Sequence, residues 1–204
     1  MLYELATLSC PLLALGEAGD GVRAWVEDGD AKGQVIGCWR TEFGTLGRII
    51  VLRGFEAPED MTAERRRALL SANPFHAGRV VTALEMDSYA PFPFLPPIRT
   101  GYRGGVYEVR TYRLKPGGLP ATLAGWEAAI EPARPYTEHL VVNLYALDGA
   151  PRITHIWAFA SLEERAALRA NAYGAGVWPP KGGPDQIAEA TSTIALPQGV
   201  SPLS

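Results

Sequence analysis

Cysteine is scarce in this sequence, with Cys10 and Cys38 the only two among 204 residues. Two thiols cannot supply a four-cysteine metal site or a disulfide framework, so the composition favours a reducing compartment and leaves open only a single disulfide. Neither thiol has a histidine or basic neighbour to activate it, which argues against a catalytic cysteine. A glycine-rich phosphate loop, a G-x-S-x-G elbow and an H-E-x-x-H pattern are absent too, and we expect neither a metal nor a cofactor.

Long apolar runs and basic clusters are also missing. No stretch could span a bilayer, and neither Glu4 nor the short apolar run Leu12–Leu15 fits a secretory leader, so we expect a cytoplasmic protein without a membrane partner. The net charge of −3 argues against nonspecific binding of nucleic acid, and the arginines 65–67 adjoin Glu64 as on a solvated helix face. With 47% hydrophobic residues and a mean hydropathy of −0.01, the composition is typical of a globular protein.

The sequence does contain an internal repeat. The matching segments are 2–8 with 106–112 and 48–55 with 152–159, and both pairs have an offset of 104 residues. The second segment of each half is followed by a helical stretch that begins with a hydroxyl residue, Thr62–Leu69 and Ser161–Leu168. One offset kept across separate blocks predicts a tandem duplication.

The second half shows its secondary structure most clearly. Residues 106–114 alternate in polarity as a strand does, and apolar residues then recur at helical spacing from Leu119 to Ile130. Ser161 and Glu164 form a capping box, which predicts a helix over 162–172. Further strands are expected at 140–147, 152–159 and 186–196. The resulting order is β-α-β-β-α-β.

That order is the pattern of the ferredoxin-like fold, an α+β architecture with two helices on one face of an antiparallel sheet. We therefore predict two ferredoxin-like repeats packed sheet to sheet as a pseudo-dimeric α+β barrel within one chain, and we leave further homo-oligomerisation open. The predicted parts are a degenerate first repeat over 1–90, a proline-rich linker over 91–105 that packs against the body, and a second repeat over 106–204. Gly16, Gly19 and Gly21 are expected to interrupt the first helix.

Parts of the second half resemble the NIPSNAP family. Val106–Gly117 is similar to the family's opening signature, and Ile156–Phe159 followed by Ser161–Arg165 is similar to its third strand and second helix. The first half follows the same plan less closely, since Ala6 stands where Arg110 does. The resemblance implies the dimeric α+β barrel version of the ferredoxin-like fold. It supplies no catalytic motif: animal members have been linked to vesicle traffic and mitochondrial quality control, and bacterial-type members generally have no established activity.

Glu108, Arg110 and Tyr112 share one face of the strand 106–114 and form the main candidate ligand site. The binding hypothesis requires this face to look into the space between the sheets, where charge is costly unless it is paired or bound to a ligand, although the strand pattern leaves open which face does so. The alternative is a structural ion pair, with a neighbouring strand or across the pseudo-dimer. Ala6 and Leu8 occupy the matching positions of the first half, so the site is expected to be asymmetric and to belong to the second half.

His155 and Trp157 complete the candidate set on a single face of the strand 152–159. Imidazole can act as a general base or a metal ligand, but a lone histidine within a strand is more often buried for structural reasons. The sequence permits, without indicating, a metal shared by His139, His155 and Glu108.

Two functions follow from these candidates. In the first, a small, partly apolar molecule binds between the two sheets, with cofactor-independent oxygenase or isomerase chemistry left open and Trp178 as a lid. In the second, the protein is a non-enzymatic interaction module whose polar strand face is structural. A closed cavity of about 300 Å³ or more lined by the candidate residues favours the first function, and a filled space between the sheets argues against it.

Overall fold

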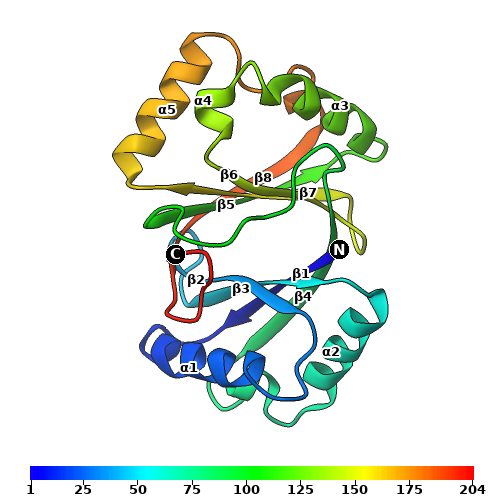
Figure 1. Ribbon diagram of the computed structural model, residues 1–204, viewed down its shortest axis with the longest axis vertical. Coiled ribbons are helices and arrows are strands. Elements are labelled where there is room, and N and C mark those ends of the chain that lie inside the picture. The colour runs from blue at the N-terminus through cyan, green and yellow to red at the C-terminus, as the bar shows by residue number, and fades with distance from the viewer.

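The computed structural model describes residues 1–204, and the chain forms one closed barrel of eight antiparallel strands (Figure 1). The order of strands around the barrel is β1-β3-β2-β8-β5-β7-β6-β4. Their bounds are β1 (Leu2–Ser9), β2 (Gln34–Phe43), β3 (Arg48–Phe55), β4 (Ala83–Pro91), β5 (Val106–Leu114), β6 (Leu140–Ala146), β7 (Arg152–Phe159) and β8 (Ile187–Pro197). Closure of the sheet removes the free edges that an open sheet would expose.

The barrel consists of two four-stranded sheets with the same internal order. The first half supplies β4-β1-β3-β2 and the second supplies β8-β5-β7-β6. The two sheets join where β2 pairs with β8 and where β4 pairs with β6, both times as antiparallel ladders. The predicted pair of ferredoxin-like units in a pseudo-dimeric α+β barrel is confirmed, and the sheets also meet edge to edge.

Helices cover the outer face of each sheet. In Figure 1, α1 (Leu15–Val26) and α2 (Pro58–Leu70) lie below the barrel, and α3 (Leu119–Ile130), α4 (Arg134–Thr137) and α5 (Leu162–Gly174) lie above it. Three short 3-10 helices occur at Leu12–Ala14, Pro74–His76 and Pro184–Gln186. Helix α3 begins 104 residues after α1, and α5 begins 104 residues after α2. The helices therefore keep the offset found in the sequence.

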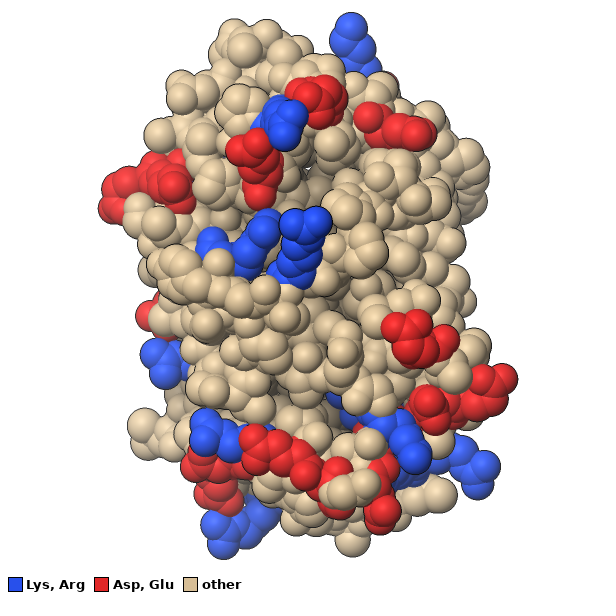
Figure 2. All heavy atoms as spheres, viewed as in Figure 1, with Lys and Arg blue, Asp and Glu red and all other residues tan.

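Charged side chains are mixed in sign over the visible surface. On the face shown in Figure 2, basic and acidic groups lie interspersed over the helical layers at both ends of the molecule. That face carries no extended basic stripe. No helix has both the length and the apolar character needed to cross a membrane.

The first helix is regular, so the expectation that its glycines interrupt it is wrong. Helix α1 runs unbroken through Gly16, Gly19 and Gly21. Gly21 is buried, and a Cβ at that position would lie 2.7 Å from the carbonyl oxygen of His76. The glycine thus permits close packing against the following 3-10 turn, and the burial of Val22 and Trp25 offsets its low helix propensity.

Side chains from all eight strands fill the barrel interior. This core contains Tyr3, Leu5, Ile36, Trp39, Ile50, Leu52, Tyr89, Tyr107, Val109, Val142, Leu144, Ile156, Ala158 and Ala195, together with Leu203. Each sheet also has a core on its outer face, between the sheet and its own helices. The space between the two sheets is therefore packed, and it cannot be the predicted binding site.

Strand β5 turns its candidate residues away from that interior. Tyr107 and Val109 belong to the interior core, whereas Tyr112 packs against the core beneath α3 and α5. Glu108 and Arg110 share the outer face with Tyr112, because alternate residues of a strand point to the same side. The predicted inward orientation of these residues is wrong. Alternation shows which residues share a face, but the helix cover decides which face is the outer one.

The segment after β4 packs against the second half, as predicted for the linker. Phe92 is fully buried, and its ring centroid lies 6.0 Å from that of Trp126 and 5.6 Å from that of Phe94. The backbone N–H of Phe92 donates to the carbonyl oxygen of Asn143 at 3.0 Å. These contacts place the start of the linker beside β6 and against the helical layer.

Candidate functional site

Four polar residues form a row across the outer face of the second sheet. The strand register places Ser192 beside Arg110, Arg110 beside His155, and His155 beside Asn143. This row contains four of the ten buried side-chain atoms that have no hydrogen-bond partner, namely Nε of Arg110, Nε2 of His155 and both polar atoms of the Asn143 amide. Each unpartnered buried group costs about 1–3 kcal/mol, so their concentration here needs an explanation other than stability.

His155 is held in one protonation state by its surroundings. Nδ1 of His155 accepts a hydrogen bond of 2.6 Å from Nε1 of Trp157. Burial, and then the positive charges of Arg110 and Arg169, lower the pKa of His155 well below its ordinary value of 6.5. The ring is therefore neutral, and because Nδ1 is an acceptor its single proton is on Nε2. His155 presents a hydrogen-bond donor, not a base.

Glu108 is the counter-ion for three arginines. Its carboxylate accepts hydrogen bonds from Arg165 at 2.8 and 2.6 Å and from the Ser192 hydroxyl at 2.6 Å. Arg110 and Arg169 approach the same carboxylate only to 3.7 and 3.9 Å. Burial raises the pKa of Glu108, but the hydrogen bonds from Arg165 and Ser192 and the charges of Arg110 and Arg165 together lower it by more. Glu108 therefore forms a structural ion pair, as the alternative proposed. Its partner is Arg165 of α5 and not a residue of a neighbouring strand.

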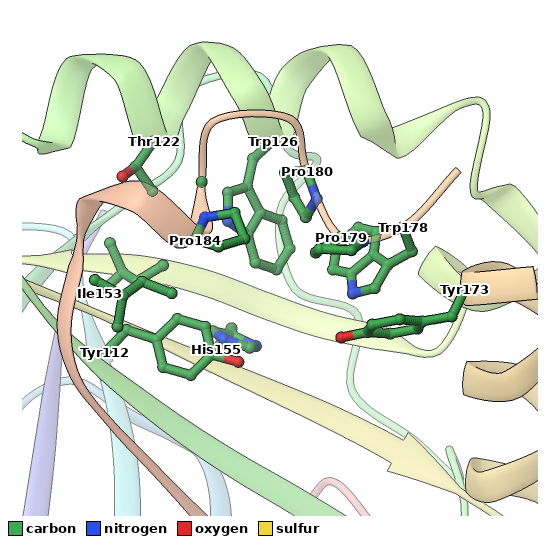
Figure 3. A pocket seen from close by; sticks show the side chains of 12 residues that line it. Tyr112, Thr122, Trp126, Ile153, His155, Tyr173, Trp178, Pro179, Pro180 and Pro184 are labelled. Atoms are coloured by element: carbon green, nitrogen blue, oxygen red, sulfur yellow. The ribbon is translucent and has the colours of Figure 1, made fainter. Parts of the chain in front are cut away.

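A cavity of about 150 Å³ lies between this sheet, α3 and the loop that follows α5. Figure 3 shows Tyr112, Ile153 and His155 on its strand side, Trp126 reaching down from α3, and Trp178, Pro179 and Pro180 along the loop. Tyr173 of α5 lies at one side, with its hydroxyl directed toward the group. The walls are mainly aromatic and aliphatic, and the polar side chains lie on the strand side and at the α5 side.

The candidate residues divide into two groups around this cavity. Tyr112 and His155 line it, with their ring centroids 4.8 Å apart. Trp157 acts on the cavity through its hydrogen bond to His155, and the guanidinium carbon of Arg110 lies 5.2 Å from the ring centroid of Tyr112. Glu108 is further back, bound to Arg165. Three of the five candidates therefore support the cavity from behind.

Several lining residues were not among the predicted site residues. Trp126 belongs to the core beneath α3 and α5, and its ring also forms a cavity wall, 5.0 Å from the His155 ring. Trp178 is only 5% exposed and packs edge-on against Trp126 at 5.0 Å. Tyr173 had no sequence signal beyond its place at the end of a helix, because only tertiary packing brings α5 to β5.

The suggested shared metal site does not form. No group of three or more His, Cys, Asp or Glu side chains comes close enough together to hold a metal ion. His139 instead stacks on Phe159 with 5.2 Å between ring centroids, and its Nδ1 lies 3.0 Å from the carbonyl oxygen of Ala158. His139 thus takes part in packing and backbone hydrogen bonding.

The first half fills the corresponding space with apolar side chains. The row that matches Ser192, Arg110, His155 and Asn143 by strand pairing consists of Met86, Ala6, Val51 and Cys38. Leu8 and Val22 stand where the second half has Tyr112 and Trp126, and both are fully buried. The same framework is therefore a solid core in one half and a polar-floored cavity in the other.

The architecture defines the class of protein first. A solved structure of an anthrone oxidase-like protein superposes with a TM-score of 0.66 over 97% of this chain and 91% of its own, at 13% sequence identity. That likeness concerns the fold, and it places the chain among the dimeric α+β barrels.

Sequence comparisons then identify the family. The NIPSNAP family model matches residues 107–202. A NipSnap homolog of Dictyostelium discoideum is 24% identical over 155 residues, which are 74% of this chain and 68% of that protein. A NIPSNAP family protein of unknown function from Agrobacterium tumefaciens is 33% identical over 50% of this chain and 94% of its own, with a TM-score of 0.41. The chain belongs to the NIPSNAP family.

Proposed function

We propose that the protein binds a small, partly apolar molecule in the cavity of its second half. The observation that carries this proposal is an aromatic cavity whose lining includes the buried His155, with an Nε2 that has no hydrogen-bond partner in the protein. A ligand oxygen at that position would supply the missing hydrogen bond. The first half supports the proposal, because the same framework without a ligand site is filled by Leu8, Val22 and Val51.

The cavity limits the size of the ligand. Its volume of about 150 Å³ is close to that of an apolar cavity known to take a benzene ring, and it is below the range of about 300–1,000 Å³ typical of larger ligands. Trp126 and Trp178 offer flat faces for an aromatic or conjugated body. A single ring with one polar substituent fits these dimensions.

The lining favours binding over acid–base catalysis. Cofactor-independent oxygenase or isomerase reactions that begin by removing a substrate proton need a base within hydrogen-bond reach. No carboxylate lines the cavity, and Nδ1 of His155 already accepts from Trp157. Such chemistry on this protein would require a substrate that arrives already deprotonated.

Titration with benzamide and with benzoate tests the proposal. The five tryptophans give five indole N–H signals in a nitrogen–proton NMR spectrum. We expect the signals of Trp126 and Trp178 to shift with at least one probe, while those of Trp25 and Trp39 in the first half stay in place. His155→Val introduces the residue found at the matching position 51 and should weaken binding about tenfold.

His76→Ala is the matched control, since His76 is a half-exposed histidine of the first half. The control variant should bind both probes like the wild type. If neither probe shifts Trp126 or Trp178 at about 10 mM, the proposed function is wrong.

A further inference from the structure

Two of the polar side chains that line the cavity have a proton without a hydrogen-bond partner in the protein. His155 carries its proton on Nε2, because Nδ1 accepts from Trp157, and Nε2 has no partner. The hydroxyl oxygen of Tyr173 accepts from Arg169 at 3.3 Å, which leaves its proton available. The Thr122 hydroxyl donates to the carbonyl oxygen of Gly118 at 2.9 Å, so its oxygen can only accept from a ligand. The free protons of His155 and Tyr173 therefore favour a ligand that carries a hydrogen-bond acceptor.

The charges behind the lining are predominantly positive. Arg110, Arg165 and Arg169 surround one carboxylate, Glu108, and Arg165 takes both of its oxygens. Arg110 and Arg169 have no hydrogen-bonded carboxylate, and both contact residues that line the cavity: Arg110 lies 5.2 Å from the Tyr112 ring centroid, and Arg169 donates to the Tyr173 hydroxyl at 3.3 Å. Their positive charges also lower the pKa of His155. The same field that opposes a positive charge on His155 favours a negative charge on a ligand beside it.

The first half lacks this excess of positive charge at its matching position. There Arg53 lies 2.5 Å from Glu4 and 2.6 Å from Glu64, so the buried cation has two carboxylates. Arg67 also bonds to Glu64, at 2.9 Å. The buried glutamate of the first half is thus matched by an arginine with two carboxylates, whereas Arg110 and Arg169 beside Glu108 have none within hydrogen-bond distance, which leaves room for a counter-charge from a ligand.

We propose that the natural ligand is an oxyanion on a flat apolar body, such as an aromatic carboxylate, a phenolate or an enolate. Its negative oxygen accepts from Nε2–H of His155 and faces Arg110 and Arg169, while its ring packs between Trp126 and Trp178. Trp157 acts as a positioning residue, because its indole N–H fixes which nitrogen of His155 carries the proton. This inference rests on the proposed function and narrows it to one ligand class.

Three single-ring probes of nearly equal size test the ligand class: benzoate, benzamide and benzylamine. Isothermal titration calorimetry should show benzoate binding about tenfold more tightly than benzamide, because a hydrogen bond to an ion is stronger than one to a neutral amide. Benzylamine, which is a cation and a donor, should not bind. Arg169→Gln should weaken benzoate about fivefold and leave benzamide unchanged. Arg66→Gln removes the same charge from an exposed site on α2 and should change neither affinity.

A second measurement tests the role of Trp157. The imidazole nitrogen chemical shifts of His155 should show the proton on Nε2 in the wild type. In Trp157→Phe both tautomers should be populated, and benzoate affinity should fall about threefold, since part of the protein then presents an acceptor. An unchanged tautomer in this variant would overturn the positioning role.

The outcomes separate the two proposals. Equal affinities for benzoate and benzamide, or binding of benzylamine, would overturn the oxyanion while leaving the binding cavity in place. Failure of all the probes would overturn both proposals.

Discussion

At the scale of single residues, the two halves pair a buried glutamate in different ways. Glu4 is bound by Arg53 from the neighbouring strand, whereas Glu108 is bound by Arg165 from a helix. Removing one partner of a buried pair leaves an uncompensated charge, so each glutamate keeps an arginine. Moving the arginine onto the helix leaves position 157 to a tryptophan, and that indole orients His155.

The Glu108→Gln variant should lose less stability in acid than the wild type. Burial raises the pKa of Glu108, but the hydrogen bonds from Arg165 and Ser192 and the charges of Arg110 and Arg165 together bring it below the ordinary 4.5. A carboxyl with a depressed pKa stabilises the folded state above its unfolded pKa and loses that contribution as the pH falls through its folded pKa. Urea unfolding of each protein at about pH 7 and about pH 3 gives the stability that the wild type and the variant lose between these pH values. Equal losses in both proteins would contradict the assignment of this shift.

At the scale of elements, helix α5 connects local sequence to the site. Its N-terminus is capped as predicted: the Ser161 hydroxyl accepts from the Glu164 N–H at 3.2 Å, and the Glu164 carboxylate accepts from the Ala160 N–H at 2.6 Å. The helix begins at Leu162, as the capping box predicts, and extends two residues beyond the predicted end, to Gly174. Those last residues matter because Tyr173, at the edge of the cavity, is one of them.

Ser161→Ala should destabilise the protein by about 1 kcal/mol, because it leaves backbone N–H groups of α5 without an acceptor. Thr62→Ala is the matched control in α2, where the Thr62 hydroxyl donates to the carbonyl oxygen of Pro58 and caps nothing. The control should change the free energy of unfolding by less than about 0.5 kcal/mol. Urea denaturation measures the free energy of unfolding of both variants. Similar losses in the two variants would show that the cap contributes little.

At the scale of the whole molecule, the two halves complete one another. The interior core draws on all eight strands, and the β2–β8 and β4–β6 ladders close the sheet. Neither half could bury its interior face alone. The division into repeats over 1–90 and 106–204 with a linker over 91–105, and their origin by duplication, remain predictions, supported by the offset of 104 residues between matching helices.

The fragment 106–204 expressed alone should form a symmetric dimer. Separation exposes Tyr107, Val109 and Ile156 of the interior core, together with the edges of β6 and β8 that pair with the first half. Two copies can restore the barrel by pairing β6 of one with β8 of the other. Size-exclusion chromatography with light scattering should give twice the fragment mass. Addition of the fragment 1–105 should convert the dimer into a one-to-one complex, and a stable folded monomer would contradict this account.

Much of the secondary structure could be predicted from local patterns. The strands 106–114 and 152–159 have the expected bounds, because alternation of polarity and turn residues are local properties. The continuous helix through Gly16, Gly19 and Gly21 was not predicted, since the contact that suits Gly21 comes from residues far along the chain. Tyr112 and His155 remain candidate site residues; both line a cavity, but this cavity lies beneath the helices and not between the sheets.

The sequence by itself determined the order of elements, the family and the half of the molecule in which polar residues replace apolar ones. These follow from spacing and residue type, which are readable along the chain. Only the tertiary structure decided that Glu108, Arg110 and Tyr112 face the helices, that Arg165 neutralises Glu108 and that Trp126, Trp178 and Tyr173 enclose a cavity. The physical reason is that alternation separates the two faces of a strand without saying which of them the helices will cover. That choice depends on packing between segments distant in sequence.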